Sequence, residues 1–241
     1  MPHQVDTALM RSSRRLHRTL TRYGAYPVLF ATALCGLLFA GRAYLSRTWT
    51  FYFLLWNLFL AWVPYLGSLT AIWLHKRFPH RWWLTLLPGI VTVAFFPNAP
   101  YIVTDFLHLV TRPPVPLWYD IGLLASFALT GLFLGTYALR ILQMMVTTWL
   151  GHIFGWIFAL IVIGLSGMDI YVGRFLRWNS WDLLTQPKAI FYDLAVRLRY
   201  PWHYPGTYGV TLLFAALLLV FYLAITLRPE DDPSSIAQTA P

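Results

Sequence analysis

Asp105 and His108 are the residues whose types and spacing most clearly suggest chemistry in this chain of 241 residues. They stand three positions apart and share one face if the chain is helical there. A carboxylate and an imidazole so placed can form half of a zinc or iron site, or a general acid–base pair. They can also form a hydrogen-bonded pair in which the carboxylate orients the ring. A third metal ligand could come from Asp120, Asp169 or Asp182, although an acid at position 120 also suits the positive end of a helix dipole.

A second group of polar residues occupies the stretch 173–182 (GRFLRWNSWD), which also holds Asn179. At about 100° per residue, one helical face would carry Arg174, Arg177, Trp178, Trp181 and Asp182. Arginine forks bind phosphate or carboxylate groups through paired hydrogen bonds. The stretch therefore predicts a phosphate or lipid-headgroup pocket that faces the Asp105–His108 turn. The alternative is an interfacial amphipathic helix whose arginines contact headgroups in general.

The residues 97–100 (PNAP) are expected to end the helix that precedes the acid–histidine pair. Residues before proline are pushed out of the helical region, so we expect extended backbone at Phe96 and Ala99 and free carbonyl groups nearby. Such backbone is tolerated at membrane depth only where protein or a water-filled cavity covers it. Asn98 is predicted to cap the next turn, to join the site, or both. Asn57, inside an apolar stretch, is expected to hydrogen-bond across a helix interface.

The composition indicates an integral membrane protein. The chain is 58% hydrophobic and 11% charged, with a mean hydropathy of +0.57, whereas soluble domains carry about 25% charged residues. Its formal charge of +9 does not indicate nucleic-acid binding, because the basic residues lie between apolar stretches, where they set topology and meet anionic headgroups. The expected partner is the lipid bilayer. The single cysteine, Cys35, permits no intramolecular disulfide.

The apolar stretches predict an all-α bundle of about six transmembrane helices, formed by residues 23–227. A hydrocarbon core of about 30 Å requires spans of roughly 17 to 25 residues, and backbone groups in lipid must bond within the span. The expected spans are residues 23–41, 49–74, 82–96 (a short one), 117–139, 146–165 and 208–227. Residues 1–22 are predicted to form a basic cytoplasmic leader and residues 228–241 a disordered cytoplasmic tail.

The distribution of lysine and arginine predicts that both termini lie inside. Five arginines precede the first span, and basic residues in short inner segments carry the most weight in setting orientation. Under this topology the connections 97–116 and 168–207 both emerge on the outer face. The acid–histidine pair and the arginine-rich stretch are therefore expected on the same side of the membrane.

The blocks FPNAPYIVTD (residues 96–105) and GRFLRWNSWD (residues 173–182) resemble the hallmark blocks of a bacterial family of polytopic membrane proteins. That family is catalogued as a domain of unknown function, and the similarity extends over about residues 44–227. The resemblance implies an integral protein of the bacterial cytoplasmic membrane. It implies no substrate, cofactor or catalytic residue.

Together these observations predict an outward-facing polar site for a phosphate-bearing or lipidic ligand, with a divalent metal as a further option. In an enzyme, Asp105 and His108 would hold the metal or serve as acid and base. The expected ligand-binding residues are Asn98, Asp120, Arg174, Arg177, Trp178, Asn179 and Asp182. The alternatives are a small membrane transporter or channel, indicated by the short third span with its proline, and a scaffold that docks a partner protein.

Overall fold

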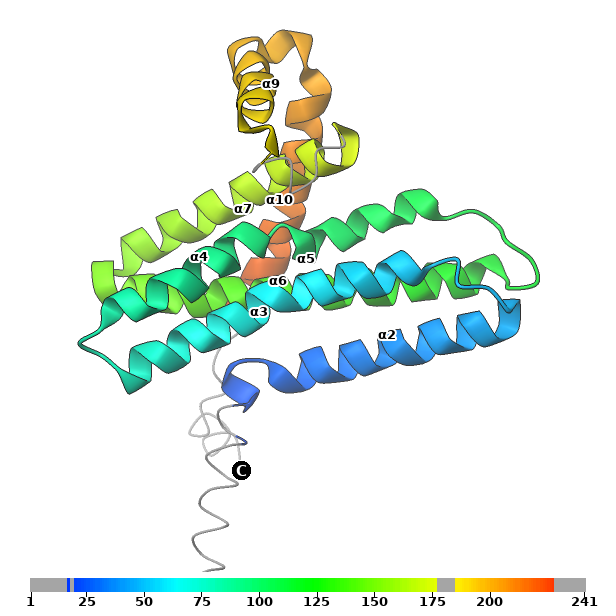
Figure 1. The fold of residues 1–241 in the computed structure, drawn as a ribbon, viewed down its shortest axis with the longest axis horizontal. Helices are drawn as coiled ribbons and strands as arrows, with labels where there is room; N and C mark the ends of the chain where they lie inside the picture. Colours follow the sequence, from blue (N-terminus) through cyan, green and yellow to red (C-terminus); the bar gives the residue numbers. More distant parts are fainter. Residues whose placement is uncertain (1–16, 18–19, 177–184, 228–241) are drawn as a thin grey trace, which may run out of the picture.

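The computed structural model describes residues 17, 20–176 and 185–227, which form helices joined by short connections (Figure 1). The helices are α2 (Ala25–Ser46), α3 (Tyr52–Arg77), η1 (Trp82–Thr85), α4 (Leu86–Phe95), α5 (Asn98–Tyr101), η2 (Ile102–His108), α6 (Leu117–Leu150), α7 (His152–Phe175), α9 (Pro187–Arg199), η3 (Pro201–His203) and α10 (Pro205–Thr226). Six segments are long and apolar enough to cross a membrane, and Trp82–His108 counts as one of them. The prediction of an all-α bundle with six spans is confirmed.

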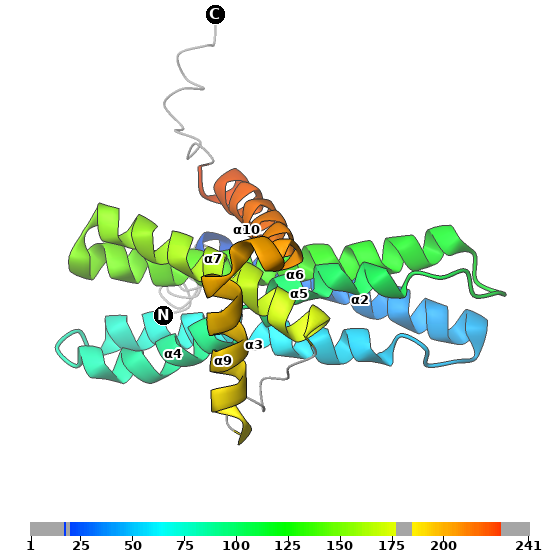
Figure 2. The same cartoon turned by 90° about the horizontal axis from the view of Figure 1, so that it is seen from above.

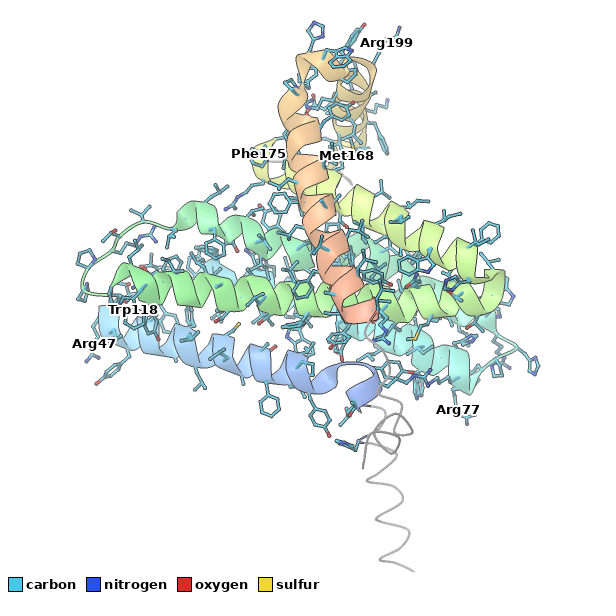
Figure 3. The ribbon with its side chains drawn as sticks, turned by 180° about the vertical axis from the view of Figure 1, so that it is seen from behind. Arg47, Arg77, Trp118, Met168, Phe175 and Arg199 are labelled. Carbon is cyan, nitrogen blue, oxygen red and sulfur yellow. The ribbon has the colours of Figure 1, made fainter. Side chains whose placement is uncertain are left out.

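The long helix α6 is the centre of the bundle and packs against α2, α3, α5, η2, α7 and α10. In the most apolar stretch of α6, 61% of the residues are buried, compared with 11% in α10. α9 lies across α4 and α7 (Figure 2), and α10 runs steeply across α6 (Figure 3). The helices that surround α6 therefore position the polar residues, while α10 presents most of its surface outward.

Two glycines one turn apart on α6 let the third span approach closely. A Cβ atom at Gly131 would lie 2.3 Å from the carbonyl oxygen of Ala99, and one at Gly135 would lie 3.1 Å from the Ala99 Cβ atom. Small residues at this spacing allow transmembrane helices to pack backbone to backbone. Protein therefore covers α5 at the point where the third span departs from regular helix.

The prediction of extended backbone at Phe96 and Ala99 is wrong. Phe96 has φ −54° and ψ −41°, and Ala99 lies within α5. The Phe96 N–H donates to the Val93 carbonyl and the Ala99 N–H to the Phe96 carbonyl, so bonds between residues three apart carry the helix past the prolines. Packing of α5 on α6 outweighs the preference of residues that precede proline. The third span consequently reaches His108, well beyond its expected end at residue 96.

The fourth and fifth spans are also displaced from their expected ends at residues 139 and 165. α6 continues to Leu150 and turns at Gly151, whose φ of 97° favours glycine. Residues 140–150 contain neither glycine nor proline, so nothing in them stops the helix. α7 then extends to Phe175, which places Arg174 in the last turn of a membrane-length helix.

Candidate functional site

Asp105 is the buried centre of a polar cluster built from three segments. The residue is 1% exposed. Asn57 of α3 donates a hydrogen bond from Nδ2 to Oδ2 of Asp105 at 2.8 Å, which confirms that Asn57 finds a partner across a helix interface. The guanidinium of Arg174 on α7 lies 3.6 Å from Oδ1, which accepts no hydrogen bond from the described residues. Because a buried carboxylate requires compensating partners, these contacts tie α3 and α7 to η2.

Arg174 connects the two polar blocks of the sequence. Its Nη2 atom donates to the carbonyl oxygen of Thr104 at 2.9 Å and to Nδ1 of His108 at 3.0 Å. The guanidinium also lies over the ring of Tyr101, 5.5 Å from its centroid. Since arginine only donates, Nδ1 of His108 is the acceptor of this hydrogen bond. Asp105 and His108 both face Arg174, as expected for two residues three apart on a helix.

The guanidinium of Arg174 lies between Asp105 and His108, where a shared metal ion would have to sit. The described residues contain no group of three or more His, Cys, Asp or Glu side chains that could hold a metal ion. Asp120 pairs with Arg42 instead. The observed geometry is that of a buried ion pair with a hydrogen-bonded imidazole, and the metal prediction receives no support from these contacts.

A second ion pair, between Arg42 on α2 and Asp120 on α6, lies buried at the same end of the bundle. Nε donates to Oδ1 at 3.0 Å and Nη2 to Oδ2 at 3.3 Å, and the two residues are 2% and 0% exposed. Sequence reasoning placed Arg42 in a connection, because the first span was expected to end at residue 41. The helix continues to Ser46 and buries Arg42. The sequence offered one signal for this pair: Arg42 follows an apolar stretch, and Asp120 lies in the first turn of another apolar helix.

Arg112, in the connection 109–116, is a functional candidate that sequence reasoning counted only as a loop charge. Its Nη1 atom donates to the carbonyl oxygen of His108 at 3.3 Å. The Phe51 ring lies beneath the guanidinium groups of both Arg112 and Arg42, with each 5.1 Å from the centroid. Among the described residues, Arg112 forms no ion pair with a carboxylate. This end of the bundle therefore carries more guanidinium groups than carboxylates.

Among the described residues, neither Asn98 nor Asp120 bonds Asp105, whose side-chain partners are Asn57 and Arg174. The side-chain amide of Asn98 donates to the carbonyl oxygen of Phe95 at 3.1 Å, and so bonds a backbone group at the end of α4. Four predicted ligand-binding residues lie outside the described part of the chain: Arg177, Trp178, Asn179 and Asp182. The structure brings together Asp105, His108 and Arg174, and adds Asn57 and Arg112 to them.

A bundle of six membrane-length helices with a charged cluster buried near one end defines a polytopic membrane protein. The chain belongs to the family described as protein of unknown function (DUF1361), whose model matches residues 56–221. The match includes Asn57, Asp105, His108, Arg112 and Arg174, but not Arg42. No curated protein and no solved structure matches the sequence.

Proposed function

We propose that this end of the bundle binds the phosphate group of a lipid or of another phosphate-bearing ligand. The observation that carries the proposal is the position of two guanidinium groups at His108, with Arg112 at 3.3 Å from its carbonyl oxygen and Arg174 at 3.0 Å from Nδ1. Guanidinium groups donate paired hydrogen bonds to phosphate oxygens. A bound anion would offset the positive charge that Asp105 and Asp120 leave unbalanced.

The contacts support distinct roles for the residues of the cluster. Asp105, held by Asn57, would fix the position of the Arg174 guanidinium. His108 would offer its Nε2–H group to a ligand oxygen. In an enzymatic version, Asp105 and His108 would act as acid and base on a bound phosphate ester, and Arg174 would stabilise developing negative charge.

A lipid is the favoured source of the phosphate because of what surrounds the cluster. The exposed Trp118 lies at the same end of the bundle as Arg47 (Figure 3), and the exposed Trp49 follows Arg47 in the connection between α2 and α3. Aromatic residues of this kind gather at the level of the headgroups. Phospholipid phosphates occupy the same depth, so a headgroup would reach the site without leaving the membrane. In the proposed orientation, with the N-terminus inside, the headgroup belongs to the outer leaflet.

Lipid binding in dodecyl maltoside micelles tests the proposal, with phosphatidylglycerol as the probe and native mass spectrometry as the readout. We expect Arg112→Gln to weaken phosphatidylglycerol binding about tenfold, because one charge-assisted contact is lost. Arg174→Gln should weaken it as well. Arg77→Gln is the matched control, because Arg77 is exposed at the opposite end of the bundle (Figure 3) and should leave binding unchanged.

Two further measurements separate the possible ligands. If inorganic phosphate displaces phosphatidylglycerol, the phosphate group itself is the bound feature. If only glycerol phosphates displace it, the site recognises the headgroup as well as the phosphate. Equal binding by the wild type and Arg112→Gln would contradict the proposal. A folded wild type that binds neither probe would leave a small transporter or channel, or a scaffold for a partner protein.

A further inference from the structure

A cavity of about 290 Å³ lies between α4, α7 and α9, apart from the Asp105 cluster. Its walls are mostly apolar, with Val93 from α4, Val172 from α7 and Phe191 from α9 among the lining residues. Asp169 on α7 is the single ionisable side chain among the described residues that line it. The cavity therefore places one carboxylate against an apolar wall within a membrane-length helix.

Asp169 differs from the other two acids of the membrane-length helices. Asp105 and Asp120 each face an arginine, at 3.6 Å and 3.0 Å respectively. Asp169 has no hydrogen-bond or ion-pair partner among the described residues. Carboxylates in membrane spans are rare, usually face a cavity, and are usually paired. Asp169 is exposed, and an ammonium group that enters the cavity would supply the ion pair that this carboxylate lacks among the described residues.

A second, larger cavity of about 420 Å³ also lies against α4. Val93 and Ala94 line both cavities. The second cavity lies against α6 and α7 and has an almost entirely apolar lining, with Gly89 and Trp149 among its residues. Two neighbouring apolar cavities, one of them with a carboxylate in its lining, match the polarity of an alkyl chain with a cationic head.

We propose that these two neighbouring cavities together bind an amphiphile whose protonated amine pairs with Asp169 and whose alkyl chain lies along α4 past Val93 toward Gly89. The site is distinct from the phosphate site proposed above, since Arg112 and Arg174 line neither cavity. α9 covers the amine end with the apolar residues Ile190, Phe191 and Leu194. Burial of the chain supplies most of the affinity, and the carboxylate selects for the amine.

Two probes that differ only in their head group test the charge selection. Dodecylamine and dodecanol are titrated separately into the protein in dodecyl maltoside micelles, and binding is measured by native mass spectrometry. We expect the wild type to bind dodecylamine about tenfold more tightly than dodecanol, as a charge-assisted hydrogen bond predicts. Equal affinity for the two probes would overturn the proposal without any variant having to fold.

Matched acid variants assign the selection to one residue. Asp169→Asn should reduce the preference for the amine to near unity while leaving dodecanol binding unchanged. Asp193→Asn is the control, because Asp193 lies on α9 with a half-exposed side chain and pairs with Arg197. A preference that persists in Asp169→Asn, or that disappears in Asp193→Asn, would refute the assignment.

Matched glycine variants test the path of the ligand's alkyl chain. No atom lies within 4 Å of a Cβ atom at Gly89 or at Gly36, so both positions have room for a larger side chain. Gly89→Leu should fill the second cavity and weaken both probes about tenfold, in line with the apolar area lost to the ligand. Gly36→Leu, on the exposed surface of α2, should change neither. Unaltered binding of both probes by Gly89→Leu would exclude this path for the alkyl chain of the ligand.

Discussion

The buried ion pair between Arg42 and Asp120 should contribute to stability in a way that depends on the presence of both partners. Their side chains are 3% and 0% exposed, and two hydrogen bonds of 3.0 Å and 3.3 Å join them. Replacing Asp120 by leucine leaves the guanidinium buried beside the Phe51 ring with no carboxylate. Removal of one partner of a buried pair typically costs about 3–5 kcal/mol. We expect a loss of that size in the free energy of unfolding.

Replacing both partners should restore much of that stability. In Arg42→Met combined with Asp120→Leu, no charge remains to be desolvated, and apolar pairs of similar volume often match or exceed the stability of the ion pair. The free energy of unfolding of the double variant should therefore lie within about 1–2 kcal/mol of the wild-type value, as expected for apolar replacements of similar volume. The difference between the double variant and the sum of the single variants measures the coupling of the pair.

Unfolding in mixed micelles, followed by circular dichroism as sodium dodecyl sulfate replaces dodecyl maltoside, supplies the free energies. Asp193→Asn is the control, because its partner Arg197 is one turn away and the Asp193 side chain is 37% exposed. Exposed pairs contribute about 0–1 kcal/mol. The reasoning is refuted if Asp120→Leu loses no more than the control, or if the double variant is as unstable as Asp120→Leu alone.

Two other substitutions test contacts that position Asp105, with the same unfolding assay. Asn57→Leu should cost about 1–3 kcal/mol, because the buried Asp105 carboxylate loses its 2.8 Å donor; an unchanged stability would show that Asn57 makes no net contribution. Gly131→Ala should cost about 1–3 kcal/mol, since its Cβ atom would lie 2.3 Å from the Ala99 carbonyl oxygen and force α5 away from α6. Gly122→Ala, where no atom lies within 4 Å, should be neutral or stabilising, and equal losses in the two variants would contradict the packing argument.

The sequence was sufficient to predict those features that depend on composition and local spacing. The number of spans follows from apolar length, which the hydrocarbon core fixes. The partner of Asn57 across a helix interface follows from the cost of an unbonded amide in lipid. That Arg174 lies at the same end of the bundle as Asp105 and His108 follows from an even number of membrane crossings between the two blocks. Each of these predictions rests on a constraint that the membrane imposes on any chain.

The features that sequence reasoning missed depend on which helices touch. Phe96 stays helical because α5 packs on the glycines of α6, and that contact joins residues about 35 positions apart in the sequence. Arg42 was assigned to a connection because the first span was expected to end at residue 41, and its buried partner Asp120 lies 78 positions away in the sequence. Local preference cannot reveal such partners, because the same residues would have other neighbours in another arrangement of the helices. The spacing of Gly131 and Gly135 is a local clue to this close packing.

In this bundle, the close packing of small residues positions the polar contacts, and both kinds of contact hold the helices together. Lipid provides no hydrophobic drive for helices to associate, so close packing at Gly131 and specific polar bonds must do so. The close approach of α5 to α6 holds the start of η2, and η2 carries Asp105 to within reach of both Asn57 and Arg174. Since Arg174 also bonds Thr104 and His108, a shift of α5 would move every acceptor of its guanidinium together. A substitution at Gly131 should therefore weaken phosphatidylglycerol binding as well as stability, although the glycine lies on a helix that contributes none of the proposed anion contacts.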